Sequence, residues 1–373
     1  MSRYALLATG GSGGHVFPAV ALGRRLSNHG WRVDYMIDSR VQHMLAKAVP
    51  REAIKRIHAK SPSAGFGRFS AVFLLGWGFL GAFVRMVIRR PDVVVGFGSY
   101  ASVPPLAAAV VLCVPIVLHE QNAISGRANR LFARFARAVA ICYPKPQGLS
   151  SARWVVRTGS PVREGFVPTP YPQSTDPLRL VIFGGSQGAK VFSQVFPQAF
   201  HQLPERLRMR LSIHQQAAYK DIEKLERIYQ DSGIHAEIVP FIHDMPEQLV
   251  RAHLVICRAG ATTLCELAQV GRPALLVPYR YTLDGDQTAN AAYLASLGCV
   301  WVLREEHLTA TRAAKQLTQI LSDRDDLARR AKIITSQSAQ DALTHLYDVV
   351  QSCVAKQSHH ADTTSNNKKT PVS

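Results

Sequence analysis

In the stretch YALLATGGSGGHVFPAV, residues 4–20, an apolar run passes through a glycine-rich turn into a helical segment, and this order indicates the fold class. Residues 4–8 are apolar on both faces, as expected of a strand in a parallel sheet that helices cover. Glycine lets backbone N–H groups converge in the turn, and the start of the helix adds a partial positive charge. The stretch therefore predicts a binding site for a phosphate or another electron-rich group.

The same order of strand, turn and helix recurs along both halves of the chain. The first helix is expected from residue 17, with Pro18 in its first turn and Gly30 just past its end. Further strands are expected at residues 31–37, 92–97, 115–119 and 138–143, and later at the runs LRLVIF, RLSIHQQ, AEIVPFI, LVICRAG and PALLVPY. This alternation predicts an α/β fold with two parallel-sheet domains.

The domain limits follow from proline content and polarity. Residues 160–179 carry five prolines and little periodicity, which is typical of a linker. We therefore expect a first domain at residues 1–160, a Pro-rich linker at 161–179 and a second domain at 180–339. The polar residues 357–373 are expected to be disordered.

Composition and charge narrow the class of partner. A net charge of +18 favours an anionic partner, which can be nucleic acid, a phosphorylated small molecule or an acidic lipid surface. No nucleic-acid-binding motif is recognisable, so nucleic acid is not expected. The six cysteines form no CxxC pair, and the N-terminus has no signal peptide, so a cytoplasmic protein is expected.

The segment FSAVFLLGWGFLGAFV, residues 69–84, has no charged residue and is followed by Arg85, Arg89 and Arg90. It is shorter than the roughly 20 residues that a spanning helix needs. Three interpretations stay open: a buried core helix, a patch on a membrane surface whose arginines meet anionic headgroups, and a transmembrane span.

Two more glycine-rich turns follow apolar runs, at residues 96–104 and 183–189. GFGSYA (96–101) fits the G-x-G-x-x-A form of the dinucleotide fingerprint, with Glu120 downstream as the acidic residue, which would favour an NAD-linked enzyme. Against this reading, the loop follows a middle strand of its domain. The lysine of a Walker A loop is absent from the glycine-rich turns, which excludes a P-loop ATPase.

The segment CRAGATTLCELAQVGRPALLVPY, residues 257–279, places a strand, a turn of small residues and a helix in order. Glu266 lies one to two turns into that helix, where a carboxylate can grip two vicinal hydroxyls of a ribose. The N–H groups of residues 261–264 can meet a diphosphate. The alternative is that Glu266 is an ordinary solvent-facing helix residue.

Six motifs together resemble the MurG family, bacterial peripheral membrane transferases that move N-acetylglucosamine from its UDP donor onto lipid I. They are GGSGGHVFPA (10–19), GSYASVPPLAAA (98–109), LHEQNAISGRANR (118–130), FGGSQGA (183–189), CRAGATTLCELA (257–268) and DGDQTANA (284–291). The resemblance implies a GT-B fold, with two Rossmann-like domains facing a central cleft and a last helix, about residues 340–356, packing back on the first domain.

The resemblance also implies roles for individual residues. His15 would be the general base that takes the proton of the acceptor's 4-hydroxyl. Donor binding would involve Ser12, Gly13, Gly14, Asn122, Arg163, Ser186, Ile242, Ala261, Thr262, Thr263, Leu264, Cys265, Glu266 and Gln287, supported by Arg258 and Asn290. The acceptor side would involve Gly98, Tyr100, Ser102, His119 and Glu120. Displacement would invert the anomeric carbon without a covalent intermediate, and no metal or other cofactor would be required.

The same resemblance gives residues 69–84 a role, because the polyprenyl tail of lipid I stays in the membrane. The expected membrane contacts are Phe73, Leu74, Leu75, Trp77, Phe79, Leu80, Phe83, Arg85, Arg89 and Arg90. Arg127, Arg130, Arg134 and Arg137, at helical spacing, would add positive charge. The protein would then lie on the cytoplasmic face of the inner membrane, with UDP-N-acetylglucosamine, lipid I, the anionic membrane surface and other cell-wall synthesis and division proteins as partners. A UDP-N-acetylglucosamine 2-epimerase, which shares the fold, is the alternative.

The chain departs from the family pattern at three positions. Ser160 stands where the family has asparagine, and Ser99 stands where the second glycine loop has a further glycine. Asp286 precedes Gln287, where the family tends to have an uncharged or basic residue. Residues 284–286 then read DGD, which resembles the D-x-D metal motif of another glycosyltransferase fold, although their context does not favour a metal site.

Overall fold

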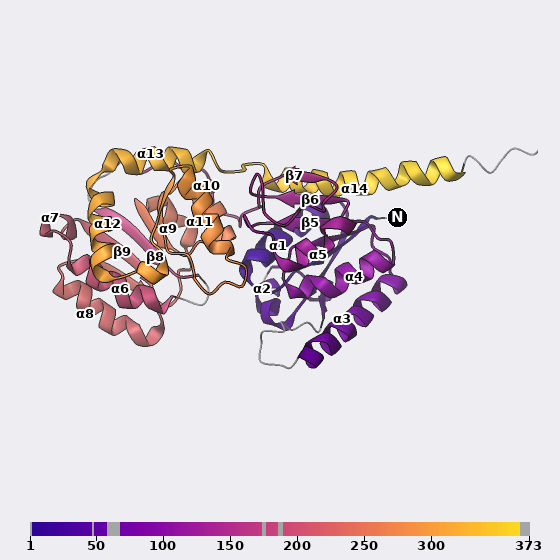
Figure 1. Cartoon of the computed structure of the whole chain (residues 1–373), viewed down its shortest axis with the longest axis horizontal. Coiled ribbons are helices and arrows are strands. Elements are labelled where there is room, and N and C mark those ends of the chain that lie inside the picture. The colour runs from indigo at the N-terminus through magenta and orange to yellow at the C-terminus, as the bar shows by residue number, and fades with distance from the viewer. Residues whose placement is uncertain (1, 47, 58–67, 174–176, 186–188, 366–373) are drawn as a thin grey trace, which may run out of the picture. The chain divides into compact units, whose positions relative to one another are not determined.

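The computed structural model describes residues 2–46, 48–57, 68–173, 177–185 and 189–365. The chain divides into unit 1, Met1–Pro161 with Asp341–Ser373, and unit 2, Val162–Gln340 (Figure 1). The boundary at Pro161 falls at the start of the proline-rich segment. Each unit has its own sheet and its own apolar core.

Unit 1 is built, within the described residues, on a seven-stranded parallel sheet in the order β3-β2-β1-β4-β5-β6-β7. Its strands are β1 (Tyr4–Ala8), β2 (Arg32–Ile37), β3 (Ile54–Arg56), β4 (Val93–Gly96), β5 (Ile116–Glu120), β6 (Ala138–Ile141) and β7 (Val155–Arg157). The central strands β4 and β5 are buried along their whole length, as expected when helices cover both faces of a parallel sheet.

Helices cover both faces of this sheet. The helices of unit 1 are α1 (Gly13–Asn28), α2 (Gln42–Leu45), α3 (Arg68–Ile88), α4 (Val103–Val111), α5 (Arg127–Phe132) and α14 (Ala342–Ser365). On one face, α1 and α14 share an apolar cluster that includes Leu22, Leu26, Leu346 and Val350. On the other face, α3, α4 and α5 share a second cluster with Leu106 and Phe132. The last helix thus packs on unit 1, as the resemblance implies.

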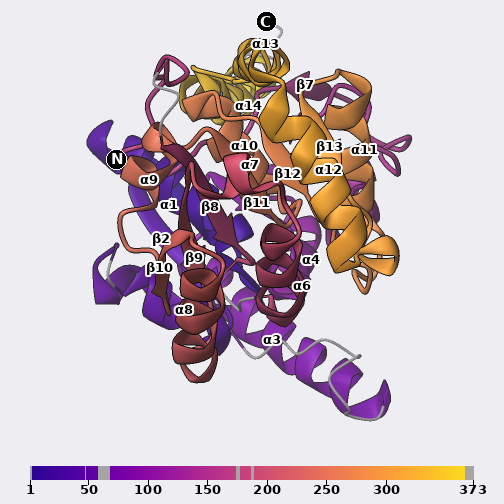
Figure 2. The ribbon, with the colours of Figure 1, turned by 90° about the vertical axis from the view of Figure 1, so that its left-hand side faces the viewer.

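Unit 2 repeats this plan on a six-stranded parallel sheet, within the described residues, in the order β10-β9-β8-β11-β12-β13. Its strands are β8 (Leu178–Phe183), β9 (Leu211–Gln216), β10 (His235–Val239), β11 (Leu254–Cys257), β12 (Ala274–Leu276) and β13 (Val300–Val302). Its helices are α6 (Lys190–His201), α7 (Glu205–Arg208), α8 (Ile222–Asp231), α9 (Met245–Arg251), α10 (Ala261–Val270), α11 (Asp286–Ser296), α12 (Ala310–Ser322) and α13 (Arg324–Thr335). Figure 2 looks onto this unit, with helices on both faces of the strands.

The strand order places the ligand sites. In each sheet the direction of chain progression reverses between two neighbouring strands, β1 and β4 in unit 1 and β8 and β11 in unit 2. Ligands of open α/β sheets bind beyond the carboxyl ends of the strands at such a reversal. The glycine-rich turns at residues 10–14 and 96–99 follow β1 and β4, and the turn at residues 258–260 follows β11.

Three expectations differ from the structure. Helix α1 begins at Gly13, so Pro18 lies inside the helix rather than in its first turn. The strands β3, β7 and β13, three residues each, were not expected. Residues 357–365 are helical, although they were expected to be disordered, and residues 366–373 lie outside the described residues.

Candidate functional site

The first glycine-rich turn is packed against the rest of unit 1. A Cβ added at Gly10 would lie 2.5 Å from the Cβ of Ala101 and 2.9 Å from Oδ2 of Asp38. Gly11 has a φ of +79°, and a Cβ there would lie 2.8 Å from Oγ of Ser99. Side chains are therefore excluded from these two positions by neighbouring loops of the protein itself.

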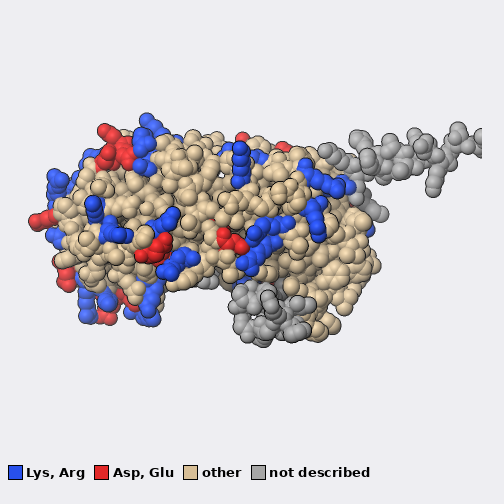
Figure 3. All heavy atoms as spheres, viewed as in Figure 1, with Lys and Arg blue, Asp and Glu red and all other residues tan. Residues whose placement is uncertain are grey.

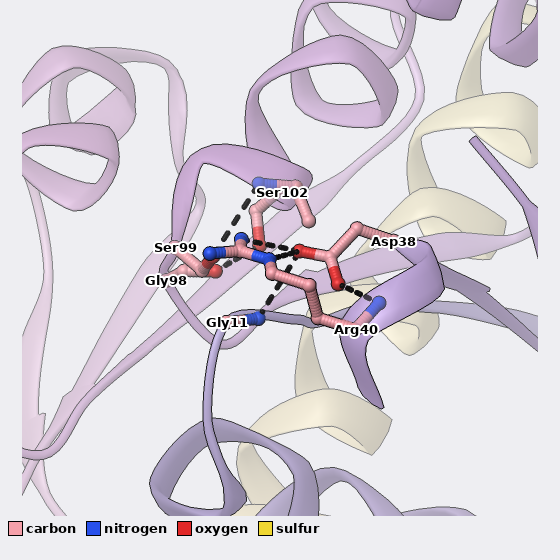
Figure 4. Close-up of polar contacts among 7 residues, drawn as sticks. Gly11, Asp38, Arg40, Gly98, Ser99 and Ser102 are labelled. Atoms are coloured by element: carbon pink, nitrogen blue, oxygen red, sulfur yellow. Dashed lines mark hydrogen bonds and ion pairs between the residues drawn. The ribbon is translucent and has the colours of Figure 1, made fainter. Parts of the chain in front are cut away.

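Asp38, which follows β2, ties this turn to an arginine. Its buried carboxylate accepts hydrogen bonds from the backbone N–H of Gly11 at 3.2 Å and of Arg40 at 3.0 Å. It also pairs with the guanidinium of Arg40, which is about half exposed (Figure 4). The sequence held one indication of Asp38, because an acidic residue after the second strand is typical of Rossmann-like folds. Sequence reasoning nevertheless missed both residues.

The second glycine-rich turn approaches His15. A Cβ at Gly98, whose φ is +90°, would lie 3.2 Å from Cε1 and 3.3 Å from Nδ1 of His15. The buried hydroxyl of Ser102 lies within hydrogen-bond distance of the carbonyl oxygens of Ala8 and Gly98 and can donate to either. Ser102 therefore joins the two turns and is too buried to meet a substrate, whereas Tyr100 beside it is half-buried.

We expect the Ser99→Gly variant to raise the free energy of unfolding of unit 1 by about 0.5–1 kcal/mol. Ser99 has φ 70° and ψ 157°, a backbone conformation that is essentially restricted to glycine. The relief of strain should outweigh the greater flexibility of glycine in the unfolded chain. Urea unfolding would measure the change. The control is Ser151→Gly, at an exposed turn where φ is not positive; equal or lower stability of Ser99→Gly relative to wild type would contradict the prediction.

His15 lies in the first turn of α1 and is half-buried. Its Nδ1 lies 3.2 Å from Oε1 of Gln121. Within the described residues, Nε2 of His15 has no hydrogen-bond partner. A base at this position is therefore held through one ring nitrogen and keeps the other available.

The residues after β5 form a buried hydrogen-bonded turn around Glu120. Its Oε1 accepts from the backbone N–H of Asn122 at 3.0 Å, and its Oε2 accepts from the N–H of Gly126 and from Nδ2 of Asn129, each at 2.9 Å. Burial raises the pKa of Glu120, and these hydrogen bonds lower it part of the way back. With both oxygens used inside the protein, Glu120 is not placed to bind a ribose, so the dinucleotide-fingerprint interpretation of residues 96–101 was wrong.

His119 and Glu120 were expected on the acceptor side. Both side chains are buried. Gln121 is buried as well, and its amide contacts the rings of His15 and His119. These side chains can support the site from below but do not reach its surface. Gln121 was not among the predicted site residues, although it lies within the HEQN motif that carried the resemblance.

In unit 2, Glu266 and Arg163 form an ion pair. Nε of Arg163 donates to Oε1 of Glu266 at 2.7 Å, although 103 residues separate them. Glu266 is buried on the second turn of α10, so it is not a solvent-facing helix residue. Burial raises the pKa of its carboxyl, and Arg163 lowers it part of the way. The two residues expected to contact ribose and diphosphate thus hold one another in place.

Two side chains of α11, Gln287 and Asn290, stabilise the turn before α10 by hydrogen bonds to its backbone. Oε1 of Gln287 accepts from the N–H groups of Ala259 at 3.2 Å and Tyr279 at 3.0 Å, which fixes the orientation of its amide. Among the described residues, its Nε2 has no partner and is available to donate. Asn290, buried behind it, donates to the carbonyl of Ala259.

Arg258 supports the same turn. Its guanidinium makes a two-point ion pair with Glu305, at 2.8 and 3.2 Å, and donates to the carbonyl of Val277. It also lies over the rings of Phe192 and Tyr279. Its supporting role was expected, but Glu305 was not, since nothing in the local sequence links the two.

The remaining donor-side residues are placed as follows. Ala261, Thr262 and Thr263 form the first turn of α10, where an α-helix leaves backbone N–H groups without intrahelical acceptors. Leu264 is buried, Cys265 is half-buried and Ile242 is buried beside α9. Ser186 lies outside the described residues. Asp286 is the first residue of α11, and no group of three His, Cys, Asp or Glu side chains within the described ranges is placed to hold a metal.

Helix α3 presents two different faces. Its side chains Ala82 and Met86 are buried, and Phe79 and Phe83 pack against the same cluster as α4, so the core-helix interpretation holds for this face (Figure 1). On the other face, Phe73 is 71% exposed and Trp77 is 59% exposed. Leu80, Val84, Val87, Ile88, Arg85, Arg89 and Arg90 are exposed as well, whereas Leu74 and Leu75 are half-buried.

Three observations concern the wider surface and the membrane. In the described part of the chain, no helix combines the length and apolarity needed to cross a membrane. Figure 3 shows one face of the molecule, on which Lys and Arg side chains lie on both units while Asp and Glu gather mainly on unit 2. Arg137 donates to the carbonyl of Cys353 on α14, so it anchors that helix rather than extending a basic stripe.

Known protein families and curated proteins match this chain over most of its length. Residues 5–141 match the glycosyltransferase family 28 N-terminal domain, and residues 179–346 match the glycosyltransferase family 28 C-terminal domain. The UDP-N-acetylglucosamine--N-acetylmuramyl-(pentapeptide) pyrophosphoryl-undecaprenol N-acetylglucosamine transferase of Methylobacterium sp. (strain 4-46) is 43% identical, over 92% of this chain and 95% of that protein. The protein of the same name from Rhizobium rhizogenes is 42% identical, over 95% and 96%.

Solved structures of related proteins share the fold of this chain. The crystal structure of Acinetobacter baumannii MurG superimposes with a TM-score of 0.78 at 29% identity, covering 94% of this chain and 99% of that one. The UDP-GlcNAc 2-epimerase of Neisseria meningitidis superimposes with a TM-score of 0.65 at 13% identity, covering 94% and 100%, which is a likeness of fold alone. The chain therefore has the GT-B fold and belongs to glycosyltransferase family 28, in the MurG family of N-acetylglucosamine transferases.

Proposed function

We propose that this chain transfers N-acetylglucosamine from UDP-N-acetylglucosamine to the 4-hydroxyl of the N-acetylmuramyl group of lipid I. The product is lipid II, a precursor of peptidoglycan. The observation that carries the proposal is the identity of 42–43% to transferases of that name over at least 92% of the chain. The epimerase alternative has only the likeness of fold.

The two units divide the chemistry in this proposal. In unit 1, Nε2 of His15 accepts the proton of the acceptor hydroxyl as its oxygen attacks the anomeric carbon. The bond from that carbon to the diphosphate oxygen breaks, and the configuration inverts. In unit 2, Glu266 binds the ribose hydroxyls, the amide of Gln287 donates to the sugar, and the backbone at Ile242 reads the uracil.

The experiment that separates the two functions follows the fate of the donor. Labelled UDP-N-acetylglucosamine is incubated with the enzyme, with and without a lipid I analogue. The proposal predicts release of UDP only when lipid I is present. Epimerisation of the sugar at carbon 2 in the absence of an acceptor would contradict the transferase function and support the epimerase function.

We propose that the departing UDP is stabilised by the protein alone. The first turn of α10 supplies backbone N–H groups and a positive helix end, and Arg163 supplies a cation held by Glu266. We therefore expect saturating EDTA to leave the transfer rate unchanged. A loss of activity that Mg²⁺ or Mn²⁺ restores would contradict this.

We propose that the exposed face of α3 rests on an anionic membrane surface. Aromatic and aliphatic side chains on that face would enter the interface, and Arg85, Arg89 and Arg90 would meet the headgroups. Lipid I carries its diphosphate at such a surface, so this docking would bring unit 1 to the acceptor. The location that follows is the cytoplasmic face of the inner membrane, where other cell-wall synthesis and division proteins are candidate partners.

The variant Phe73→Ser/Trp77→Ser is expected to bind anionic vesicles at least about tenfold more weakly, because each side chain gains about 1.5–3 kcal/mol on leaving water. Vesicle sedimentation would measure the change. The matched control is Tyr219→Ser, an aromatic residue of unit 2 that is 83% exposed. Equal binding of the α3 variant and the control would remove α3 from the membrane contact.

A further inference from the structure

His15 stands at the end of a chain of hydrogen bonds that starts at the backbone. Nε2 of His119 lies 3.1 Å from the carbonyl oxygen of Gly159. Nδ1 of His119 lies 2.7 Å from Nε2 of Gln121, and Oε1 of Gln121 lies 3.2 Å from Nδ1 of His15. His119 and Gln121 are buried, so both must exchange hydrogen bonds within the protein.

The direction of each hydrogen bond follows from its partners. A carbonyl oxygen only accepts, so Nε2 of His119 carries a proton. Burial lowers the pKa of His119 to about 4, so the ring is neutral and its Nδ1 can only accept. The side-chain amide of Gln121 must therefore present its nitrogen to His119. The same nitrogen lies 3.4 Å from the carbonyl oxygen of Phe97, a second acceptor, which agrees with this orientation.

With the amide oriented in this way, its oxygen faces Nδ1 of His15. That oxygen accepts only, so in neutral His15 the proton lies on Nδ1 and the lone pair lies on Nε2. Gly98 leaves room for the ring in this orientation, since a Cβ there would lie 3.2 Å from Cε1 of His15. Nε2 is the nitrogen that has no hydrogen-bond partner within the described residues.

We propose that Gln121 and His119 are positioning residues that fix the tautomer of His15 and place its lone pair on Nε2. The inference rests on the proposed function, in which His15 is the general base. The nearby carboxyl of Glu120 is engaged by Asn122, Gly126 and Asn129, so it cannot replace Gln121 as the acceptor for His15. A neutral amide thus orients the base without placing a charge against it.

The test reads the tautomer directly. Nitrogen-15 spectra of the histidine-labelled enzyme distinguish Nδ1–H from Nε2–H in a neutral ring, and the signals of His15 are those that vanish in His15→Gln. The wild type is expected to show His15 with Nδ1–H. Gln121→Met should give a mixture of tautomers and a kcat about 10- to 100-fold lower, less than the loss of the base itself. The KM for UDP-N-acetylglucosamine should stay the same.

Two further variants sharpen the result. Gln121→Glu keeps an oxygen that accepts from Nδ1 of His15 but cannot donate to Nδ1 of His119. His15 should therefore keep the proton on Nδ1 that Gln121→Met no longer fixes. Gln215→Met, a matched change at another buried glutamine in unit 2, should change neither the tautomer nor kcat. An Nε2–H tautomer in the wild type, or an unchanged tautomer in Gln121→Met, would overturn the inference. A wild type that transfers no sugar would overturn the proposed function instead, and the wild-type spectrum would still decide the tautomer.

Discussion

The variant His15→Ala is expected to lower kcat for transfer to lipid I by about 10²- to 10⁴-fold, the usual contribution of a positioned general base. His15 lies where both glycine-rich turns of unit 1 meet, and the absence of a side chain at Gly98 makes room for its ring. Removal of the imidazole leaves the acceptor hydroxyl with only water to take its proton. The measurement is steady-state transfer at saturating donor and acceptor.

The control for this variant is His43→Ala, an exposed histidine on α2 in the same unit, which should keep the wild-type rate. The KM for UDP-N-acetylglucosamine should change little in His15→Ala. The general-base role would be excluded by a His15→Ala enzyme that keeps much more than about a hundredth of the wild-type kcat, because a positioned base contributes at least about 10²-fold.

The second large effect concerns the donor. Glu266→Ala is expected to raise the KM for UDP-N-acetylglucosamine about 10- to 100-fold, because hydrogen bonds to a charged group contribute about 1.5–3 kcal/mol. The substitution also removes the carboxylate that pairs with Arg163 at 2.7 Å. The rate at saturating donor should fall less than the KM rises.

A modified donor separates ribose binding from a purely structural role. The wild type should discriminate against 2′-deoxy- and 3′-deoxyribose analogues of the donor, and Glu266→Ala should treat them like the natural donor. Glu266→Gln, which keeps the shape and one acceptor oxygen, should be intermediate. If Glu266→Ala retained the full preference for the intact ribose, the carboxylate would not be the group that binds it.

The sequence predicted the fold in most of its parts, since long apolar runs and glycine-rich turns report local structure. The strands at residues 4–8, 92–97 and 115–119 correspond to β1, β4 and β5 within two residues. The predicted start of α1 was wrong, because proline is common in the first turn of a helix but does not have to lie there. The helix begins at Gly13, directly after Ser12 in extended conformation. In α3, one segment serves both as core and as surface, which composition cannot divide.

The candidate site was less predictable, because its contacts join residues distant in the chain. The motifs located His15 and Glu266, but no local pattern indicates that Gln121 faces His15 or that Arg163 pairs with Glu266. Asp38 and Glu305 were missed for the same reason. Ser102, His119 and Glu120 were expected to contact the acceptor, but they are buried and instead stabilise the turns from within the protein.

The linkage in the product decides whether the enzyme transfers N-acetylglucosamine to lipid I with inversion. The enzyme is incubated with UDP-N-acetylglucosamine and a lipid I analogue, and the lipid-linked product is isolated for mass and NMR analysis. We expect one added N-acetylglucosamine, joined by a β linkage to the 4-hydroxyl of the N-acetylmuramyl group. A lipid without added sugar, or an α linkage, would contradict it.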